Sequence, residues 1–129
     1  MVRIPIPRLK PTRIIQLTIT EGNAETGDIP GKPFKLHIGD NLIGRDAMCD
    51  VVLRSPTISR RHANLRVSFN QKNFTIEDLG SSNGVRLGSE VLRLSKKLIG
   101  SGEEMQVGEI KLRLLAVDED DDRTMQVFK

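Results

Sequence analysis

Residues 63–79, ANLRVSFNQKNFTIEDL, decide the fold class. Polar and apolar residues alternate along residues 63–69 and again from Phe74 onward, which is typical of β-strands with one face on a core and the other in water. Residues 70–73 lie between the two runs and include two asparagines, which favour turns. The stretch therefore predicts two short strands joined by a turn.

Similar runs recur along the chain, and no stretch keeps the 3.6-residue period of an amphipathic helix. Glycine, asparagine and proline separate these runs. The sequence therefore predicts an all-β sandwich of about 10–11 short strands. The runs that we expect as strands are residues 13–20, 34–38, 41–44, 51–53, 63–69, 74–79, 85–87, 91–94, 104–107 and 109–117.

Charge divides the 129-residue chain into three parts. Residues 1–12 contain basic but no acidic residues, and residues 118–129 contain five acids against two bases. We interpret these two segments as a basic N-terminal tail and an acidic C-terminal tail, because they lie outside the strand pattern. One domain is expected over residues 13–117.

Composition excludes several classes of function. The chain has one Cys and two His, so it has too few ligands for a zinc finger and cannot form an internal disulfide. Trp and Tyr are absent, so the aromatic surfaces on which nucleic-acid bases stack are poorly supplied. No apolar run is long enough to span a membrane and no secretory signal is recognised. We expect a cytoplasmic protein without a membrane or nucleic-acid partner.

Two segments carry residues suited to bind an anion. Gly44-Arg45 ends an expected strand just before a polar loop. Residues 55–63, SPTISRRHA, bring Ser59, Arg60 and Arg61 together. Hydroxyl, backbone N–H and guanidinium groups are the donors that an oxyanion prefers.

A third segment, residues 77–85, reads EDLGSSNGV. Asn83-Gly84 stands between two strand-like runs, and because both residue types accept a left-handed backbone the pair predicts a hairpin turn. A turn does not by itself require Ser81 and Ser82, which add small hydrogen-bond donors to the loop.

An enzymatic interpretation takes Ser59 as a nucleophile and His62 as its base. The sequence lacks the G-x-S-x-G nucleophile elbow, and a Ser-x-x-His pair often occurs by chance. We therefore expect no catalytic residue and interpret His62 as a structural histidine that bonds the loop backbone.

In their order and spacing the three segments resemble the forkhead-associated (FHA) domain, a phosphothreonine-recognising β-sandwich. The matching motifs are Gly44-Arg45, then Ser-x-x-His at 59–62, then Asp-x-x-Ser-x-Asn-Gly at 78–84. Residues 102–108 resemble the family's Gly-Asp-x-Ile-x-x-Gly stretch, although Glu103 stands where Asp is commoner. The resemblance covers about residues 13–117 and implies two twisted antiparallel sheets with the binding loops at one end.

The resemblance also implies roles for single residues. Arg45, Ser59, Arg60 and Ser82 would hold the phosphate, and Asn83 would bond the ligand main chain. Gly44, His62 and Gly84 would brace the loops, and Thr57, Arg61 and Ser81 would form a rim that reads neighbouring ligand residues. No cofactor and no metal are implied.

We therefore expect a phosphothreonine-peptide module that acts as an adaptor in Ser/Thr kinase signalling, with a bacterial kinase or its substrate as partner. One alternative is a degenerate scaffold or oligomerisation domain that binds partners without phosphate. Another is a small nucleic-acid-binding barrel that uses the basic tail and Lys96-Lys97. The presence of Arg45, Ser59, Ser82 and Asn83 together favours the phosphothreonine module.

Thr124 lies in the acidic tail, after several acids. Acids upstream of a Thr resemble sites used by bacterial Ser/Thr kinases. A phosphorylated Thr124 would be a ligand attached to the domain itself, and it would either close the site or join two copies. We expect a monomer, or a dimer formed through this phosphorylated tail.

Overall fold

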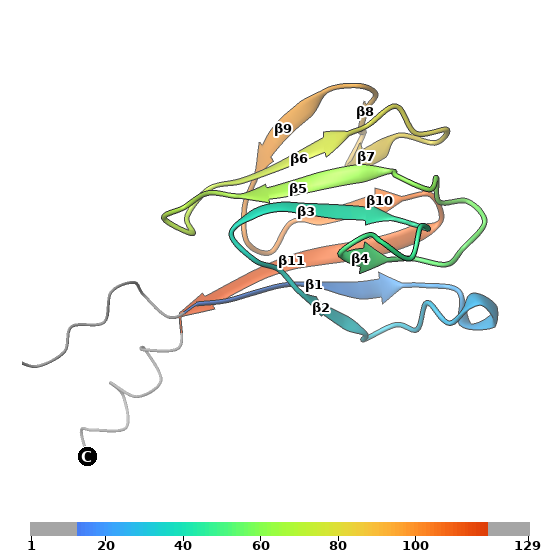
Figure 1. Ribbon diagram of the computed structural model, residues 1–129, viewed down its shortest axis with the longest axis horizontal. Coiled ribbons are helices and arrows are strands. Elements are labelled where there is room, and N and C mark those ends of the chain that lie inside the picture. Colours follow the sequence, from blue (N-terminus) through green and yellow to red (C-terminus); the bar gives the residue numbers. More distant parts are fainter. Residues whose placement is uncertain (1–12, 119–129) are drawn as a thin grey trace, which may run out of the picture.

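The computed structural model describes residues 13–118, which form two β-sheets packed face to face (Figure 1). A single 3-10 turn, η1 (Ala24–Thr26), is their only helical structure, and no helix among the described residues is long and apolar enough to cross a membrane. The six-stranded sheet has the order β2 (Pro33–Lys35), β1 (Arg13–Glu21), β11 (Ile110–Asp118), β10 (Glu104–Val107), β7 (Val85–Leu87) and β8 (Glu90–Leu92). The five-stranded sheet has the order β4 (Val51–Val52), β3 (Gly39–Gly44), β5 (Ala63–Val67), β6 (Phe74–Asp78) and β9 (Lys96–Ile99). The predicted all-β sandwich is confirmed.

The core lies between the inner faces of the two sheets. Alternate residues of each long strand point inward, as the period of two requires. From the six-stranded sheet these include Leu17 and Leu112, and from the five-stranded sheet Leu65 and Ile76, all with 0% exposure. The alternation read from the sequence is therefore the pattern that fixes which face of each strand is buried.

The longest ladder joins β1 and β11 antiparallel, with Arg13 opposite Asp118. These two residues also form an ion pair, with 2.7 Å between the Arg13 Nε and an Asp118 carboxylate oxygen. The ladder brings the two ends of the described chain side by side (Figure 1). Because Asp118 belongs to β11, the last strand runs one residue past the boundary expected from the sequence.

The hairpin predicted at Asn83-Gly84 is wrong. β6 lies in the five-stranded sheet and β7 in the six-stranded sheet, so residues 79–84 cross from one sheet to the other. Gly84 does adopt the positive φ, +73°, that the Asn-Gly signal indicates. Local propensity predicts the left-handed backbone of Gly84 but not the conformation of Asn83, and it does not choose the partner of the following strand.

Other differences lie at the sheet edges. β9 was missed because its residues are mostly exposed, with only Ile99 buried, and show no alternation. The strand expected over residues 34–38 is β2, which runs from Pro33 to Lys35. Not every pair is antiparallel, because β4 pairs with β3 in parallel.

The core predicts a clear stability difference between two leucines. We expect Leu112→Ala, at a site with 0% exposure, to lower the free energy of unfolding by about 2–5 kcal/mol, because it leaves a cavity. Leu98→Ala is the matched control, since Leu98 is 66% exposed and should cost less than about 0.5 kcal/mol. Urea denaturation of both variants measures the difference, and equal losses would contradict this assignment of the core.

Candidate functional site

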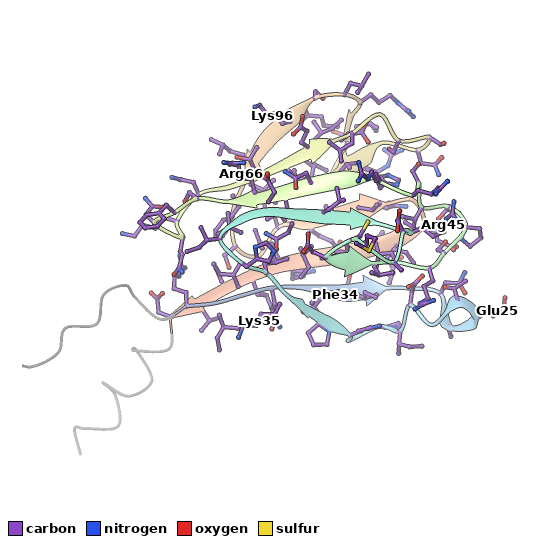
Figure 2. All side chains as sticks on the ribbon, viewed as in Figure 1. Glu25, Phe34, Lys35, Arg45, Arg66 and Lys96 are labelled. Carbon is purple, nitrogen blue, oxygen red and sulfur yellow. The ribbon has the colours of Figure 1, made fainter. Side chains whose placement is uncertain are left out.

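Three loops meet at one end of the sandwich, the end where Figure 2 labels Arg45. They are residues 45–50 after β3, residues 53–62 before β5 and residues 79–84 between β6 and β7. Together they enclose a shallow hollow of about 280 Å³, which we call the loop hollow. Its lining residues are Arg45, Pro56, Thr57, Ile58, Ser59, Arg60, Ser82 and Asn83. All five residues predicted to contact a phosphopeptide are therefore brought together, although they come from separate segments.

Arg45 follows the last residue of β3 and is held by the neighbouring loop. Its backbone N–H donates to the Ser59 carbonyl at 3.1 Å, and its Nε donates to the Ile58 carbonyl at 2.9 Å. No other hydrogen bond to its guanidinium comes from residues 13–118. The side chain is exposed and its terminal nitrogens remain available to an anion.

Hydrogen bonds between loops set the opposite wall of the loop hollow. The Ser82 N–H donates to Ser59 Oγ at 3.1 Å, which leaves the Ser59 hydroxyl hydrogen free to donate. Asn83 Nδ2 donates to the Thr57 carbonyl at 2.8 Å. The second and third loops are thus joined directly at the residues that line the site.

The buried side chain of His62 also connects the second and third loops. Its side chain is fully buried, its Nδ1 accepts from the Ser59 N–H at 3.0 Å, and its Nε2 donates to the Gly84 carbonyl at 2.8 Å. These partners require the neutral ring with hydrogen on Nε2. Burial lowers the pKa of His62 below the ordinary 6.5, against the opposing effects of the Gly84 carbonyl and Asp78.

Asp78 organises the third loop. Its carboxylate is buried and accepts from the backbone N–H groups of Gly80 at 3.0 Å and Leu94 at 2.9 Å, and from the Ser81 hydroxyl. Burial acts to raise the pKa of Asp78, but the Ser81 hydroxyl and the backbone donors outweigh it and hold the pKa below its ordinary value. The carboxylate therefore stays charged and keeps the loop folded.

Ser81 does not lie at the expected rim. Its side chain is buried, donates to Asp78 and accepts from the Gly84 N–H at 2.8 Å. A hydroxyl with both partners inside the loop braces the loop instead of facing a ligand. Of the other rim residues, Thr57 lines the loop hollow, while Arg61 is exposed outside its lining.

Two glycines allow the loops to pack closely. A Cβ on Gly44 would lie 2.1 Å from the Arg60 carbonyl oxygen, so no side chain fits there. Gly84 combines a φ of +73° with a Cβ position 2.8 Å from the Leu92 carbonyl oxygen. Both contacts agree with the bracing role expected from the sequence.

Asp28 supports the second loop, although no sequence motif singled it out. Asp28 is buried, and its carboxylate accepts from the Arg54 N–H at 2.9 Å and the Ser55 N–H at 2.8 Å. It lies in a turn far away along the chain, where an acidic residue is ordinary. A contact that joins distant loops has no local sequence pattern.

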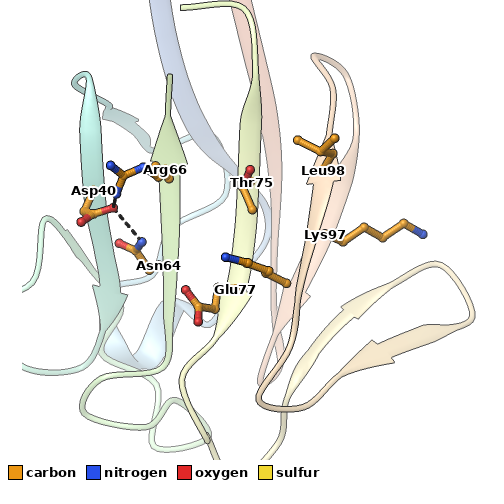
Figure 3. Close-up of a pocket in the computed structure, with 8 residues that line it drawn as sticks. Asp40, Asn64, Arg66, Thr75, Glu77, Lys97 and Leu98 are labelled. Carbon is orange, nitrogen blue, oxygen red and sulfur yellow. Dashed lines mark hydrogen bonds and ion pairs between the residues drawn. The ribbon is translucent and has the colours of Figure 1, made fainter. Parts of the chain in front are cut away.

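A larger hollow, of about 510 Å³, lies on the outer face of the five-stranded sheet (Figure 3). It contains the ion pair between Arg66 and Asp40, 2.7 Å apart, as well as Glu77. Lys96 and Lys97 also line it, but Arg66 and Lys97 are already paired with Asp40 and Glu90, so the charges here are mixed and largely neutralised. The loop hollow has two arginines and no carboxylate in its lining, so it is the better candidate for a phosphate.

The sequence model of the FHA domain family matches residues 41–108, which include all three loops. The chain belongs to the FHA family. A curated relative, the oxoglutarate dehydrogenase inhibitor of Corynebacterium glutamicum, is 33% identical over 90 residues, 70% of this chain and 60% of that protein. The chain spans less than two thirds of the curated relatives that it matches, for example 3% of one and 61% of another.

Solved FHA structures share the fold. The FHA domain of the CT664 protein from Chlamydia trachomatis is 27% identical with a TM-score of 0.68, over 79% of this chain and 96% of that chain. EmbR of Mycobacterium tuberculosis, solved in complex with a low affinity phosphopeptide, is 26% identical with a TM-score of 0.65, over 81% of this chain and 24% of that chain.

The two histidines predict opposite titrations. The pKa of His62 should lie below 6.5 because the ring is buried, and that of His37 above 6.5 because of its hydrogen bonds to the Ile38 carbonyl and Asp50. NMR titration of the ring protons measures both, and a His62 pKa at or above 6.5 would contradict the buried neutral ring.

The lowered pKa of His62 also determines how the stability of the fold depends on pH. As the pH falls, His62 is protonated in the unfolded chain before it is protonated in the folded protein. Its contribution to the free energy of unfolding is therefore complete above pH 6.5 and is lost as the pH falls through the folded pKa.

Proposed function

We propose that this FHA domain recognises phosphothreonine peptides and acts as an adaptor in Ser/Thr kinase signalling, with a kinase or its substrate as partner. The observation that carries the proposal is the loop hollow, in which Arg45, Ser59, Ser82 and Asn83 from three loops line one surface. The complex of EmbR with a phosphopeptide supports the same use of the family's fold.

The chemistry of the loop hollow suits a phosphate dianion. Arg45 and Arg60 supply positive charge, and the Ser59 and Ser82 hydroxyls supply neutral donors. A guanidinium offers two parallel N–H donors to phosphate oxygens, which an ammonium cannot do. Because loop-to-loop hydrogen bonds already hold these groups, binding costs little ordering entropy. The proposed role is binding, and no step of catalysis is assigned to Ser59 or His62.

Self-regulation through Thr124 is part of the proposal, although Thr124 lies outside the described residues. β11 begins beside the site, since the Glu109 N–H donates to Thr57 Oγ1 at 2.9 Å, and runs away from it for nine residues, about 26 Å of strand. Thr124 is six residues beyond Asp118, a reach of at most about 22 Å. The tail backbone is therefore shorter than the strand that it would have to run back along, and the site of a second copy is the proposed acceptor.

The phosphate contact predicts the effect of Arg45→Ala. Charge-assisted hydrogen bonds are worth about 1.5–3 kcal/mol, so loss of the guanidinium should weaken binding of a phosphothreonine peptide by about 10- to 100-fold. Isothermal titration calorimetry measures the affinity, and the unphosphorylated peptide should not bind. Arg66→Ala is the matched control, because Arg66 is an exposed arginine on the sheet face. Equal affinity of Arg45→Ala and wild type would refute the site.

The short distance along the chain from Asp118 to Thr124 predicts self-association. Protein phosphorylated at Thr124 should form dimers or larger assemblies as its concentration rises, and an external phosphothreonine peptide should dissociate them. Light scattering with and without peptide measures this, with Thr124→Ala treated by the same kinase as control. A phosphorylated monomer that binds external peptide at full affinity would show that the tail does not occupy any site. A monomer with a blocked site would overturn the second copy as the acceptor.

A further inference from the structure

A third hollow, of about 450 Å³, adjoins the loop hollow. It shares Thr57 and Asn83 with the loop hollow as wall residues. We call it the arginine hollow, because it contains two exposed arginines that no sequence motif singled out. Its lining residues are Thr57, Asn83, Arg86, Arg93, Gln106, Gly108 and Glu109.

The arginine hollow has spare positive charge. Arg86 makes no hydrogen bond with any residue from 13 to 118, and Arg93 makes one long bond, 3.3 Å from its Nη1 to the Ser82 carbonyl oxygen. The single carboxylate, on Glu109, accepts on its Oε2 from the Ser55 hydroxyl and from Asn23 Nδ2 at 2.8 Å, and one negative charge stands against the two arginines. Among residues 13–118, neither guanidinium group forms an ion pair with a carboxylate.

The sheet holds the floor of the arginine hollow in place. Arg86 lies on β7 directly opposite Gln106 of β10, and the Gln106 side chain donates to the Gly108 carbonyl at 3.0 Å. Gly108 and Glu109 form the turn that leads into β11, and Thr57 is bonded to this turn. Because rigid strands carry Arg86 and Gln106, the hollow is formed before a ligand arrives.

We propose that the arginine hollow binds an acidic side chain of the same peptide whose phosphothreonine occupies the loop hollow. This inference rests on the proposed function and names the ligand that the site prefers. Carboxylates are the usual partners of exposed guanidinium groups, and no other cation or aromatic surface competes in the lining. Because the two hollows share Thr57 and Asn83, we expect an extended peptide, at about 3.3 Å per residue, to reach from one to the other within two or three residues.

The test compares phosphothreonine peptides that differ at one position. One peptide has Ala at the positions two and three residues before and after the phosphothreonine, and four others have a single Asp at one of these positions. Fluorescence anisotropy measures the affinities. In wild type, one Asp peptide should bind about three- to tenfold more tightly than the Ala peptide.

Variants identify the residues responsible. In Arg86→Gln/Arg93→Gln the preference for Asp should disappear, while affinity for the Ala peptide stays within about twofold of wild type. If the lost Arg93 contact with Ser82 weakens the Ala peptide as well, Arg86→Gln alone carries the comparison. The control Arg66→Gln/Lys96→Gln removes the same charge from the hollow on the outer face of the five-stranded sheet, and it should keep the preference for Asp.

The outcomes separate this inference from the proposed function. Binding of the Ala peptide without any Asp preference, or a preference that survives in Arg86→Gln/Arg93→Gln, overturns the arginine hollow and leaves phosphothreonine recognition intact. Loss of the preference in the control variant also overturns it, because general charge would then be the cause. Failure of every phosphopeptide to bind wild type overturns the proposed function itself.

Discussion

One buried histidine joins the second and third loops and is bonded to β3, the strand from which the first loop leaves. His62 offers one acceptor to the Ser59 N–H and one donor to the Gly84 carbonyl, and its own backbone bonds Ile43 and Leu79. A neutral imidazole has one acceptor and one donor nitrogen, so both are used. A protonated ring would lose the bond to Ser59, and the residues of the loop hollow would lose their common support.

Much of this arrangement was predictable because its causes are local. Alternation along residues 63–67 and 110–114 predicted which faces are buried, and the Gly-Arg, Ser-x-x-His and Asn-Gly motifs predicted five residues of one surface. Recognising those motifs required the combination, since each occurs alone in unrelated proteins. Residues 1–12 and 119–129, which include Thr124, lie outside the residues that the structure describes, so the expectations about the two tails remain predictions.

The parts that sequence could not predict depend on contacts between distant segments. Asn83-Gly84 specified a backbone conformation, but which sheet receives β7 depends on packing. The sequence predicted that Ser81 faces a ligand, but its hydroxyl is hydrogen-bonded to Asp78 and to the Gly84 N–H inside the loop. Arg86 becomes part of a hollow only through its register with Gln106, and a one-residue shift would turn it to the other face.

The pairing of Arg13 with Asp118 also determines how the domain responds to force. A pull that separates the two chain ends loads the β1–β11 ladder at its outer pair, and antiparallel hydrogen bonds then break one pair after another instead of sharing the load. The domain should therefore peel open from that end under low tension. The loops at the opposite end keep their geometry until the peeling front has travelled the whole length of β11.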